Sequence, residues 1–499
     1  MNRQAKKMNP RSLAVAPLLA ALVLAGCATA PPPPDAKIAV PTSFKEGAPD
    51  AAIPAPPGQW KTAEPAEAQA RGQWWLAFND PALNQLQQQA LAANPNLAAA
   101  AARVKAARAS LSSSQADRWP QLGASFGGTR QKAAAVDLGQ SISTVIPPAN
   151  AWHASLTASY EVDLFQRVAN SVDAATMDAA ATEAAYRSVL LALQADVAQT
   201  YFQLRTLDAE VALLDRTLGL RLENLQLTEK RYKSGDISEF DTARARTEYN
   251  TTLAEARGLK GNRAQVEHAL ALLLGQAPAA FTAPSAPLSS ASAVPAVPAG
   301  LPSTLLERRP DVAAAQAQMM AANARIGLAR SAIFPALNLT AVGGYASYEL
   351  SDLFMWDIRT WLARAVLSMP IFDGGRNKAN IARAEASLEE SVAGYRQTVL
   401  SAFGDVEDKL STLAAVRSQT EALDDAVVSA RRSAELADKR YRAGEDSYLT
   451  LIDTQRSLLT IERQAVQLRG SWATSTVGLI RALGGSWTPA DAVVAGGKT

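Results

Sequence analysis

Two short stretches, EVDLFQR at Glu161–Arg167 and PIFDGGR at Pro370–Arg376, decide the fold of this chain. Each follows a run in which apolar and polar residues alternate, a pattern typical of a β-strand with one apolar face. Each also precedes a proline-free stretch with helical periodicity, which continues to Tyr232 in the first case and to Tyr441 in the second. Because this transition occurs twice, 209 residues apart, we infer that the chain contains a duplicated unit.

Other motifs repeat at related distances. KRYKSG at Lys230–Gly235 returns as KRYRAG at Lys439–Gly444, again 209 residues later, whereas Pro95 and Pro310 are 215 residues apart. The difference of six residues falls within the strand-like part of the unit. A length difference confined to one place is typical of a loop, so each unit is expected to hold a hairpin of two strands joined by a loop.

The helical patterns set the dimensions of the molecule. A helix that runs from Arg167 to Tyr232 would be roughly 100 Å long at 1.5 Å per residue. The predicted elements are β-hairpins at about 121–162 and 336–371 and long helices at 167–232, 238–274, 376–441 and 447–483. Coiled-coil spacing in the first long helix predicts a buried seam, formed by Leu204, Leu207, Val211, Leu214, Leu218, Leu222 and Leu225.

The strands have the length that a membrane-spanning strand needs, about 9–11 residues. Open sheet edges do not occur in lipid, and known bacterial single-chain barrels have at least about eight strands. The alternative is that these are half-buried strands of a soluble sheet, and the lipoprotein signal described next favours the membrane. If the strands lie in a membrane, four strands from one chain predict that several chains share one barrel.

The N-terminus predicts export and lipid attachment. A basic start is followed by the apolar run Leu13–Leu24, which is typical of a signal peptide at 1–26. The run ends in Leu24-Ala25-Gly26-Cys27, which resembles a bacterial lipobox, and this resemblance implies a covalent lipid on Cys27. The next residue is Ala28 and not the aspartate that retains lipoproteins at the inner membrane, which implies transfer to the outer membrane. Residues 27–65 are rich in Pro and Ala and are expected to form a lipidated tether.

Composition excludes several functions. The 49 basic and 47 acidic residues nearly cancel, so no nucleic-acid surface is expected. The single cysteine allows no internal disulfide, and the two histidines, His153 and His268, have no partners at metal-ligand spacing. We expect neither an enzyme nor a metal or cofactor site beyond the lipid. A periplasmic coiled-coil structural lipoprotein remains the alternative, although it leaves the two hairpins unexplained.

Three motifs carry a resemblance to a known family. They are WWLAFNDP at Trp74–Pro81, LLERRPDV at Leu305–Val312 and KRYRAGEDSYLTLIDTQRS at Lys439–Ser457. With them the chain resembles the outer membrane factor family, the TolC-like channels, in its lipoprotein branch that serves resistance-nodulation-division (RND) pumps. The resemblance covers nearly all of the chain beyond the tether.

The resemblance implies a mostly α-helical protein with transmembrane β-strands. Three identical chains would form a 12-stranded outer-membrane β-barrel, a long periplasmic α-helical barrel and a small equatorial domain. The channel would pass drugs or other small molecules received from a periplasmic adaptor protein and an inner-membrane RND pump. The expected divisions are repeats at 66–275 and 304–485, an equatorial linker at 276–303 and a tail at 486–499.

The resemblance also implies gate residues at the periplasmic tip of the channel. Leu449 and Asp453 match inward-facing gate positions, with Tyr441 and Arg442 nearby and Tyr441 hydrogen-bonded to Asp241. Without the resemblance, packing in a coiled-coil core explains Leu449 and Ile452 equally well.

Two glycines, Gly235 and Gly444, are expected at the helix–helix turns, and Gly444 also as a hinge. The counterpart of Asp453 in the first repeat is Arg244, so only one tip in each chain offers a carboxylate.

Overall fold

The computed structural model describes residues 29–36, 38–46, 73–132, 147–288, 295, 297, 302 and 308–485. The chain divides into two compact units, which are described separately. The first unit combines the described parts of Met1–Lys37 with Val104–Thr182 and Ala315–Tyr395. The second combines the described parts of Ile38–Arg103, Glu183–Ala314 and Arg396–Thr499. Among the described residues, no helix has both the length and the apolar character needed to cross a membrane.

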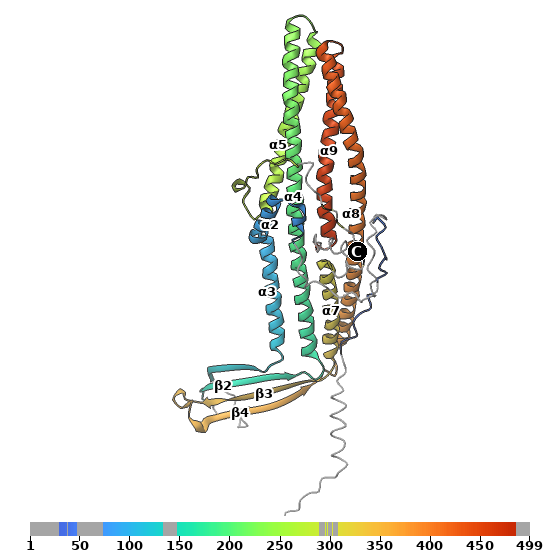
Figure 1. Ribbon diagram of the computed structural model, residues 1–499. Coiled ribbons are helices and arrows are strands. Elements are labelled where there is room, and N and C mark those ends of the chain that lie inside the picture. Colours follow the sequence, from blue (N-terminus) through green and yellow to red (C-terminus); the bar gives the residue numbers. More distant parts are fainter. Residues whose placement is uncertain are drawn as a thin grey trace, which may run out of the picture. The chain divides into compact units, whose positions relative to one another are not determined.

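The first unit contains a four-stranded antiparallel sheet (Figure 1). Its strands lie in the order β1 (Gln121–Gln131), β2 (Ala149–Val162), β3 (Ala336–Ser347) and β4 (Arg359–Ser368). The two expected hairpins therefore pair with each other through β2 and β3, where Val162 lies opposite Leu337. The outer edges of β1 and β4 have no strand partner within the described chain.

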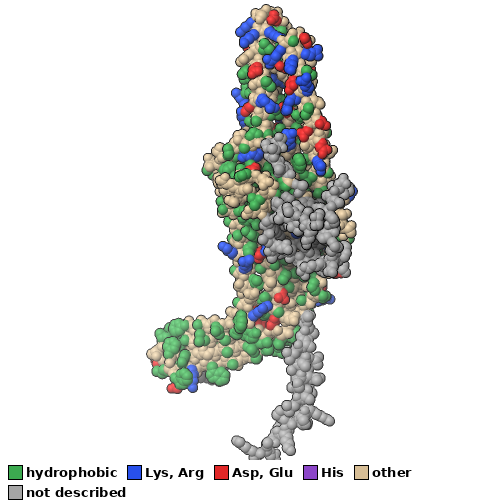
Figure 2. Space-filling view, in the orientation of Figure 1, with side chains coloured by type: hydrophobic (Ala, Val, Ile, Leu, Met, Phe, Trp, Pro, Cys, Tyr) green, Lys and Arg blue, Asp and Glu red, His purple; other side chains and the backbone are tan. Residues whose placement is uncertain are grey.

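One face of the sheet is apolar across all four strands. In register, Ala124 lies opposite Leu156, which lies opposite Gly343, which in turn lies opposite Trp361. Successive side chains in a strand alternate between the two faces, so the row beside this one is polar, and there Ser125 Oγ lies 2.8 Å from Ser155 Oγ. Trp361 is 81% exposed, and Figure 2 shows hydrophobic side chains gathered over the sheet. The described chain leaves this apolar face uncovered.

An aspartate caps each of the two long helices. Asp163 accepts hydrogen bonds from the backbone N–H groups of Val168 and Ala169, at 3.1 and 2.8 Å. Asp373 does the same for Gly375 and Asn377, both at 2.9 Å, and these bonds lower the pKa of its carboxyl group. Free N–H groups at a helix start are stabilised by such acceptors. The two joints between strand and helix are therefore built alike, as their sequences predict.

Long helices dominate the chain. They are α4 (Arg167–Lys233) and α8 (Arg376–Ala443), with 67 and 68 residues, and the shorter α3 (Pro95–Ala116), α5 (Glu239–Leu273), α7 (Pro310–Ser331) and α9 (Tyr448–Ala482). In the second unit α4 and α5 form one helical hairpin, and α8 and α9 form another (Figure 1). The end of α5 meets the start of α3, where Asn94 Nδ2 donates to Leu273 O at 2.8 Å. Likewise Arg309 at the start of α7 donates to Ala482 O, at the end of α9, at 3.2 Å.

Aromatic residues before α2 (Pro81–Ala93) pack against the helices of the second unit. Trp74 and Phe78 lie in the short 3₁₀ helix η1 (Trp74–Phe78) and are buried against Phe202 of α4. Tyr201 donates a hydrogen bond to Asp80 at 2.5 Å, and burial together with this bond raises the tyrosine pKa. The WWLAFNDP motif is thus a packing motif of the second unit.

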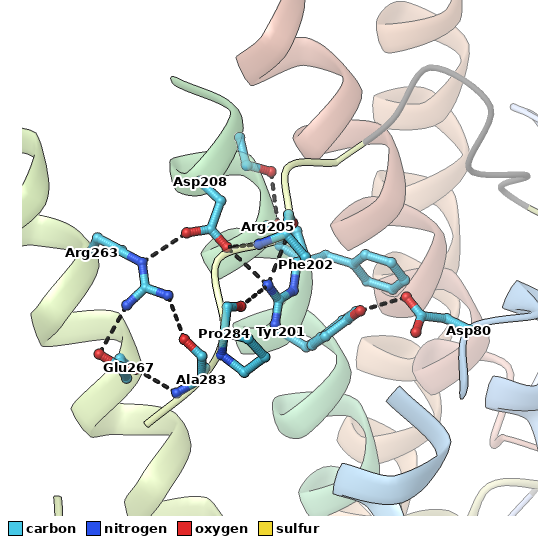
Figure 3. A network of polar contacts seen from close by, with 11 residues as sticks. Asp80, Tyr201, Phe202, Arg205, Asp208, Arg263, Glu267, Ala283 and Pro284 are labelled. Atoms are coloured by element: carbon cyan, nitrogen blue, oxygen red, sulfur yellow. Dashed lines mark hydrogen bonds and ion pairs between the residues drawn. The ribbon is translucent and has the colours of Figure 1, made fainter. Parts of the chain in front are cut away.

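A buried ion cluster holds the segment that follows α5 (Figure 3). Asp208, which is 1% exposed, receives Nη1 of Arg205 at 2.9 Å and Nε of Arg263 at 2.7 Å. The two arginines then donate to carbonyl oxygens of the segment, Arg205 to Pro284 and Arg263 to Ala283. Residues Ala283 and Pro284 are therefore fixed to α4 and α5.

Candidate functional site: the helix tips

Glycines make both turns between paired helices. Gly235 and Gly444 have φ angles of +82° and +78°, in the left-handed region that glycine adopts without steric cost. After α4, Asp236 N–H donates to Arg231 O at 2.9 Å, and after α8, Glu445 N–H donates to Arg440 O at 2.9 Å. These are Schellman turns, which satisfy the last carbonyl groups of a helix. Both glycines therefore lie in the tight turns predicted for them, while a hinge role for Gly444 stays a prediction.

Tyr441 lies in the apolar cluster of the tips and is 4% exposed. Its ring is 5.5 Å from that of Tyr448, and the guanidinium of Arg231 lies 5.0 Å from its centroid. Its hydroxyl has no hydrogen-bond partner in the described chain, whereas Asp241 accepts from Ser238 Oγ at 3.2 Å. The expected hydrogen bond between Tyr441 and Asp241 is thus not formed in this structure.

Electrostatics still couples the two groups. Burial raises the pKa of the Tyr441 hydroxyl, Arg231 opposes this change, and the nearby Asp241 carboxylate adds to it. Burial also raises the pKa of Tyr448 to about 12. Both tyrosines therefore remain neutral hydrogen-bond donors at physiological pH.

The two gate candidates on α9 share one face. Leu449 is 44% exposed and the Asp453 side chain is 59% exposed, whereas Leu451 and Ile452 are buried in the tip cluster. Residues four apart on a helix lie one above the other, so Leu449 and Asp453 point to the same side of the described chain. Arg456 lies 3.8 Å from Asp453. This face of α9 is therefore exposed in the described chain.

A groove of about 300 Å³ runs beside Leu449, between α5 and α9. Phe240 and Arg244 form part of its wall, and the Arg244 guanidinium stacks over the Phe240 ring at 4.4 Å. Arg442, the remaining gate candidate, donates to Asp438 on its own helix at 2.8 Å. Arg442 therefore stabilises the last turns of α8 in this structure and makes no contact with Asp453 or Leu449.

Comparison with known proteins identifies the family. The family model described as outer membrane efflux protein matches residues 86–276 and 301–485. The chain belongs to this family. It is 38% identical to the solvent efflux pump outer membrane protein SrpC of Pseudomonas putida, over 82% of this chain and 87% of that protein. It is 34% identical to the outer membrane protein OprJ of Pseudomonas aeruginosa, over 98% of each.

Solved structures agree with this assignment. The open state of the MtrE outer membrane channel of Neisseria gonorrhoeae is 28% identical, covers 92% of this chain and 98% of its own, and has a TM-score of 0.78. A solved structure of CusC is 30% identical, covers 86% of this chain and 99% of its own, and has a TM-score of 0.76. The protein is thus an outer membrane channel component of an efflux pump that extends into the periplasm, as expected, and family membership confirms that it is not an enzyme.

The helices of this outer membrane efflux protein contain a charged centre that sequence reasoning missed. Arg221 of α4 is 2% exposed, and its nearest acidic group is Glu248 of α5, at 3.5 Å. Glu248 also receives a hydrogen bond from Arg456 of α9. Burial lowers the pKa of Arg221, and its Nε and Nη1 atoms have no partner in the described chain. Three helices therefore meet at the carboxylate of Glu248. We call Arg221, Glu248 and Arg456 the charged centre.

The charged centre displaces the predicted apolar seam of α4. Leu214 and Leu225 are buried as expected, but Leu222 is 39% exposed and Arg221 takes the buried position. The prediction for Leu222 was wrong because the apolar heptad pattern does not continue through this turn of α4. Here the facing helices α5 and α9 present polar side chains. Asn224, also buried, donates to Gln455 of α9 at 3.3 Å. The signal in the sequence is Arg221 and Asn224, two polar residues three positions apart inside an otherwise regular apolar pattern.

Proposed function

We propose that three copies of this chain form the outer-membrane conduit of an efflux pump that exports small organic compounds. The observation that carries the proposal is the open four-stranded sheet, whose apolar face is exposed from β1 to β4. A sheet with two free edges cannot lie in lipid, because unpaired backbone groups are costly there. Three sheets joined edge to edge would supply twelve strands and remove every edge.

The relatives favour organic substrates. SrpC is named for solvents, and TtgI of Pseudomonas putida, also 38% identical, is named for toluene. The cation efflux protein CusC of Escherichia coli is less similar, at 32% identity. We infer that the channel receives its substrates from a periplasmic adaptor and an inner-membrane RND pump. Loss of the gene should then lower the tolerance of the cells to organic solvents, and the gene on a plasmid should restore it.

Native mass measurement of the full chain in detergent tests the assembly. The expected mass is that of three copies. A monodisperse monomer would overturn the conduit and would favour the alternative, a periplasmic coiled-coil lipoprotein. That alternative does not account for the uncovered apolar face of the sheet.

The proposal includes a covalent lipid on Cys27, which lies outside the described residues. Cys27→Ser should abolish labelling by a radioactive fatty acid. Because strands in the membrane would hold the protein there by themselves, some assembled channel should remain. Undiminished labelling of the variant would refute lipid attachment at this residue.

A further inference from the structure

The described part of the N-terminal segment is bonded to the folded chain. In the first unit Thr29 is 4% exposed, and its hydroxyl accepts from Asn170 Nδ2 at 2.6 Å and donates to Phe165 O at 3.4 Å. Two residues later, Pro31 O accepts from Asn323 Nδ2 at 3.0 Å. Asn170 and Asn323 are themselves buried. Residues 29–31 therefore occupy a built site near the joint between β2 and α4.

Gly327 of α7 leaves space for the side chain of Asn170. A Cβ atom on Gly327 would lie 2.8 Å from the side chain of Asn170, so a larger residue at 327 would displace this amide. Close to the same joint, the rings of Phe165 and Phe334 stack at 4.8 Å and connect the two repeats. The amide of Asn170 is thus held between α7 and the N-terminal segment.

The same segment is also bonded in the second unit. The Glu407 carboxylate accepts the backbone N–H groups of Lys45 and Glu46, at 2.8 and 2.9 Å. Phe44, just before them, is buried. A free tether would need neither the buried phenyl ring nor the paired backbone groups.

The duplication offers an internal comparison. The counterparts of Asn170 and Glu407 in the other repeat, 209 residues away, are Ala379 and Ala198. The counterparts of Asn323 and Gly327, at the 215-residue spacing, are Arg108 and Ser112. Each repeat has thus diverged at the positions that contact the N-terminal segment. This divergence fits the fact that a chain has two repeats and a single N-terminus.

We propose that Asn170 and Asn323 are positioning residues, which dock the N-terminal segment and so fix the lipid anchor beside the joint of β2 and α4. Two residues extend at most about 7 Å, so a lipid on Cys27 must attach close to Thr29. The acyl chains and the strands then enter the membrane at one place, and the anchor does not swing on a long tether. This inference rests on the proposed lipid at Cys27, whereas the docking itself does not.

A spin label at Pro33→Cys in the full-length channel tests the docking. Pro33 is exposed, and a lipidated Cys27 offers no free thiol, so one label per chain is expected. In the unaltered channel the label should be immobile. Asn170→Ala combined with Asn323→Ala should raise the ratio of the mobile to the immobile spectral component at least about tenfold, because each lost hydrogen bond contributes roughly 1 kcal/mol. Asn377→Ala is the matched control, because Asn377 Nδ2 donates to Ala332 O and not to the segment.

Thr29→Val covers the case in which the asparagine variants fail to fold, because it removes the hydroxyl group and leaves every helix unchanged. Because it removes both hydrogen bonds of the Thr29 hydroxyl, it should also mobilise the label at least about tenfold while the oligomer band is retained. A label that is mobile in the unaltered channel, or equally immobile in Thr29→Val and the control, would overturn the docking. Two labels per chain would instead refute the lipid on Cys27 and leave the docking to be judged from the label at position 33.

Discussion

Glu248→Gln should favour the open channel, because this carboxylate joins three helices at the tips. It accepts a hydrogen bond from Arg456 of α9 and lies 3.5 Å from the buried Arg221 of α4. A hydrogen bond to a charged group contributes about 1.5–3 kcal/mol. Arg456 is 57% exposed and water screens it, so the lower value applies. If opening separates α5 from α9, losing about 1.5 kcal/mol per chain raises the open population of each chain's tip about tenfold, because 1.4 kcal/mol is one decade. The effect is larger when the three tips of a channel open together.

The chain offers a matched control on the same two helices. Glu255 of α5 pairs with Arg463 of α9 at 3.4 Å, but the glutamate is 45% exposed. Exposed pairs contribute about 0–1 kcal/mol, so Glu255→Gln should change the open population less than about fivefold. Arg456→Gln removes the α9 partner and leaves Arg221 with its carboxylate, which separates opening from loss of stability.

Single-channel recordings of the full-length protein in planar bilayers would measure the open time of each variant. We expect Glu248→Gln and Arg456→Gln to open alike and well above Glu255→Gln. If all three variants open equally often, the buried position of Glu248 has no part in holding the tips closed, and the reasoning fails.

Three further predictions concern the gate, the ion pair at the start of α7 and the turn after α8. Asp453→Ala should weaken cation preference in bilayer recordings, and unchanged selectivity would mean that this carboxylate does not line the constriction. Burial alone would raise the pKa of Asp311, but the ion pair with Arg309 lowers it below the usual value. The ion pair therefore stabilises the fold above about pH 4, and this stabilisation is lost as the pH falls further. Asp311→Asn should reduce the melting temperature at neutral pH and make its decline in acid less steep. Gly444→Ala should cost about 1–2 kcal/mol of tip stability because of its positive φ, measurable as faster proteolysis at the turn, whereas Gly404→Ala inside α8 should not.

The elements of the fold could be predicted because their signals are local. Strand alternation around Trp152 and Trp361, the proline-free helical stretches and the turn glycines each depend on a few neighbouring residues. Helix α4 ends at Lys233, one residue beyond the expected Tyr232. The pairing of β2 with β3 is a contact between the two repeats, and the sequence pattern holds no register signal for it.

The charged centre and the N-terminal site could not be predicted in the same way. Arg221 reads as a surface residue until Glu248 and Arg456 are placed around it by three helices. Asn170 lies 141 residues from Thr29, and neither residue carries a motif. Sequence periodicity indicates which face of a helix is apolar, but a buried polar group depends on distant partners whose positions only the tertiary structure supplies.

The pairing of β2 with β3 places the two repeats side by side, so the duplication determines how often each side chain recurs around a ring. Six copies of a single undivided unit would repeat every residue six times at one height. Under the proposed three-chain assembly each residue recurs three times, with its counterpart from the other repeat between the copies, so Asp453 alternates with Arg244. A chain with two diverged halves can therefore vary the charge around a ring while the backbone geometry stays uniform, which a chain of one unit cannot do.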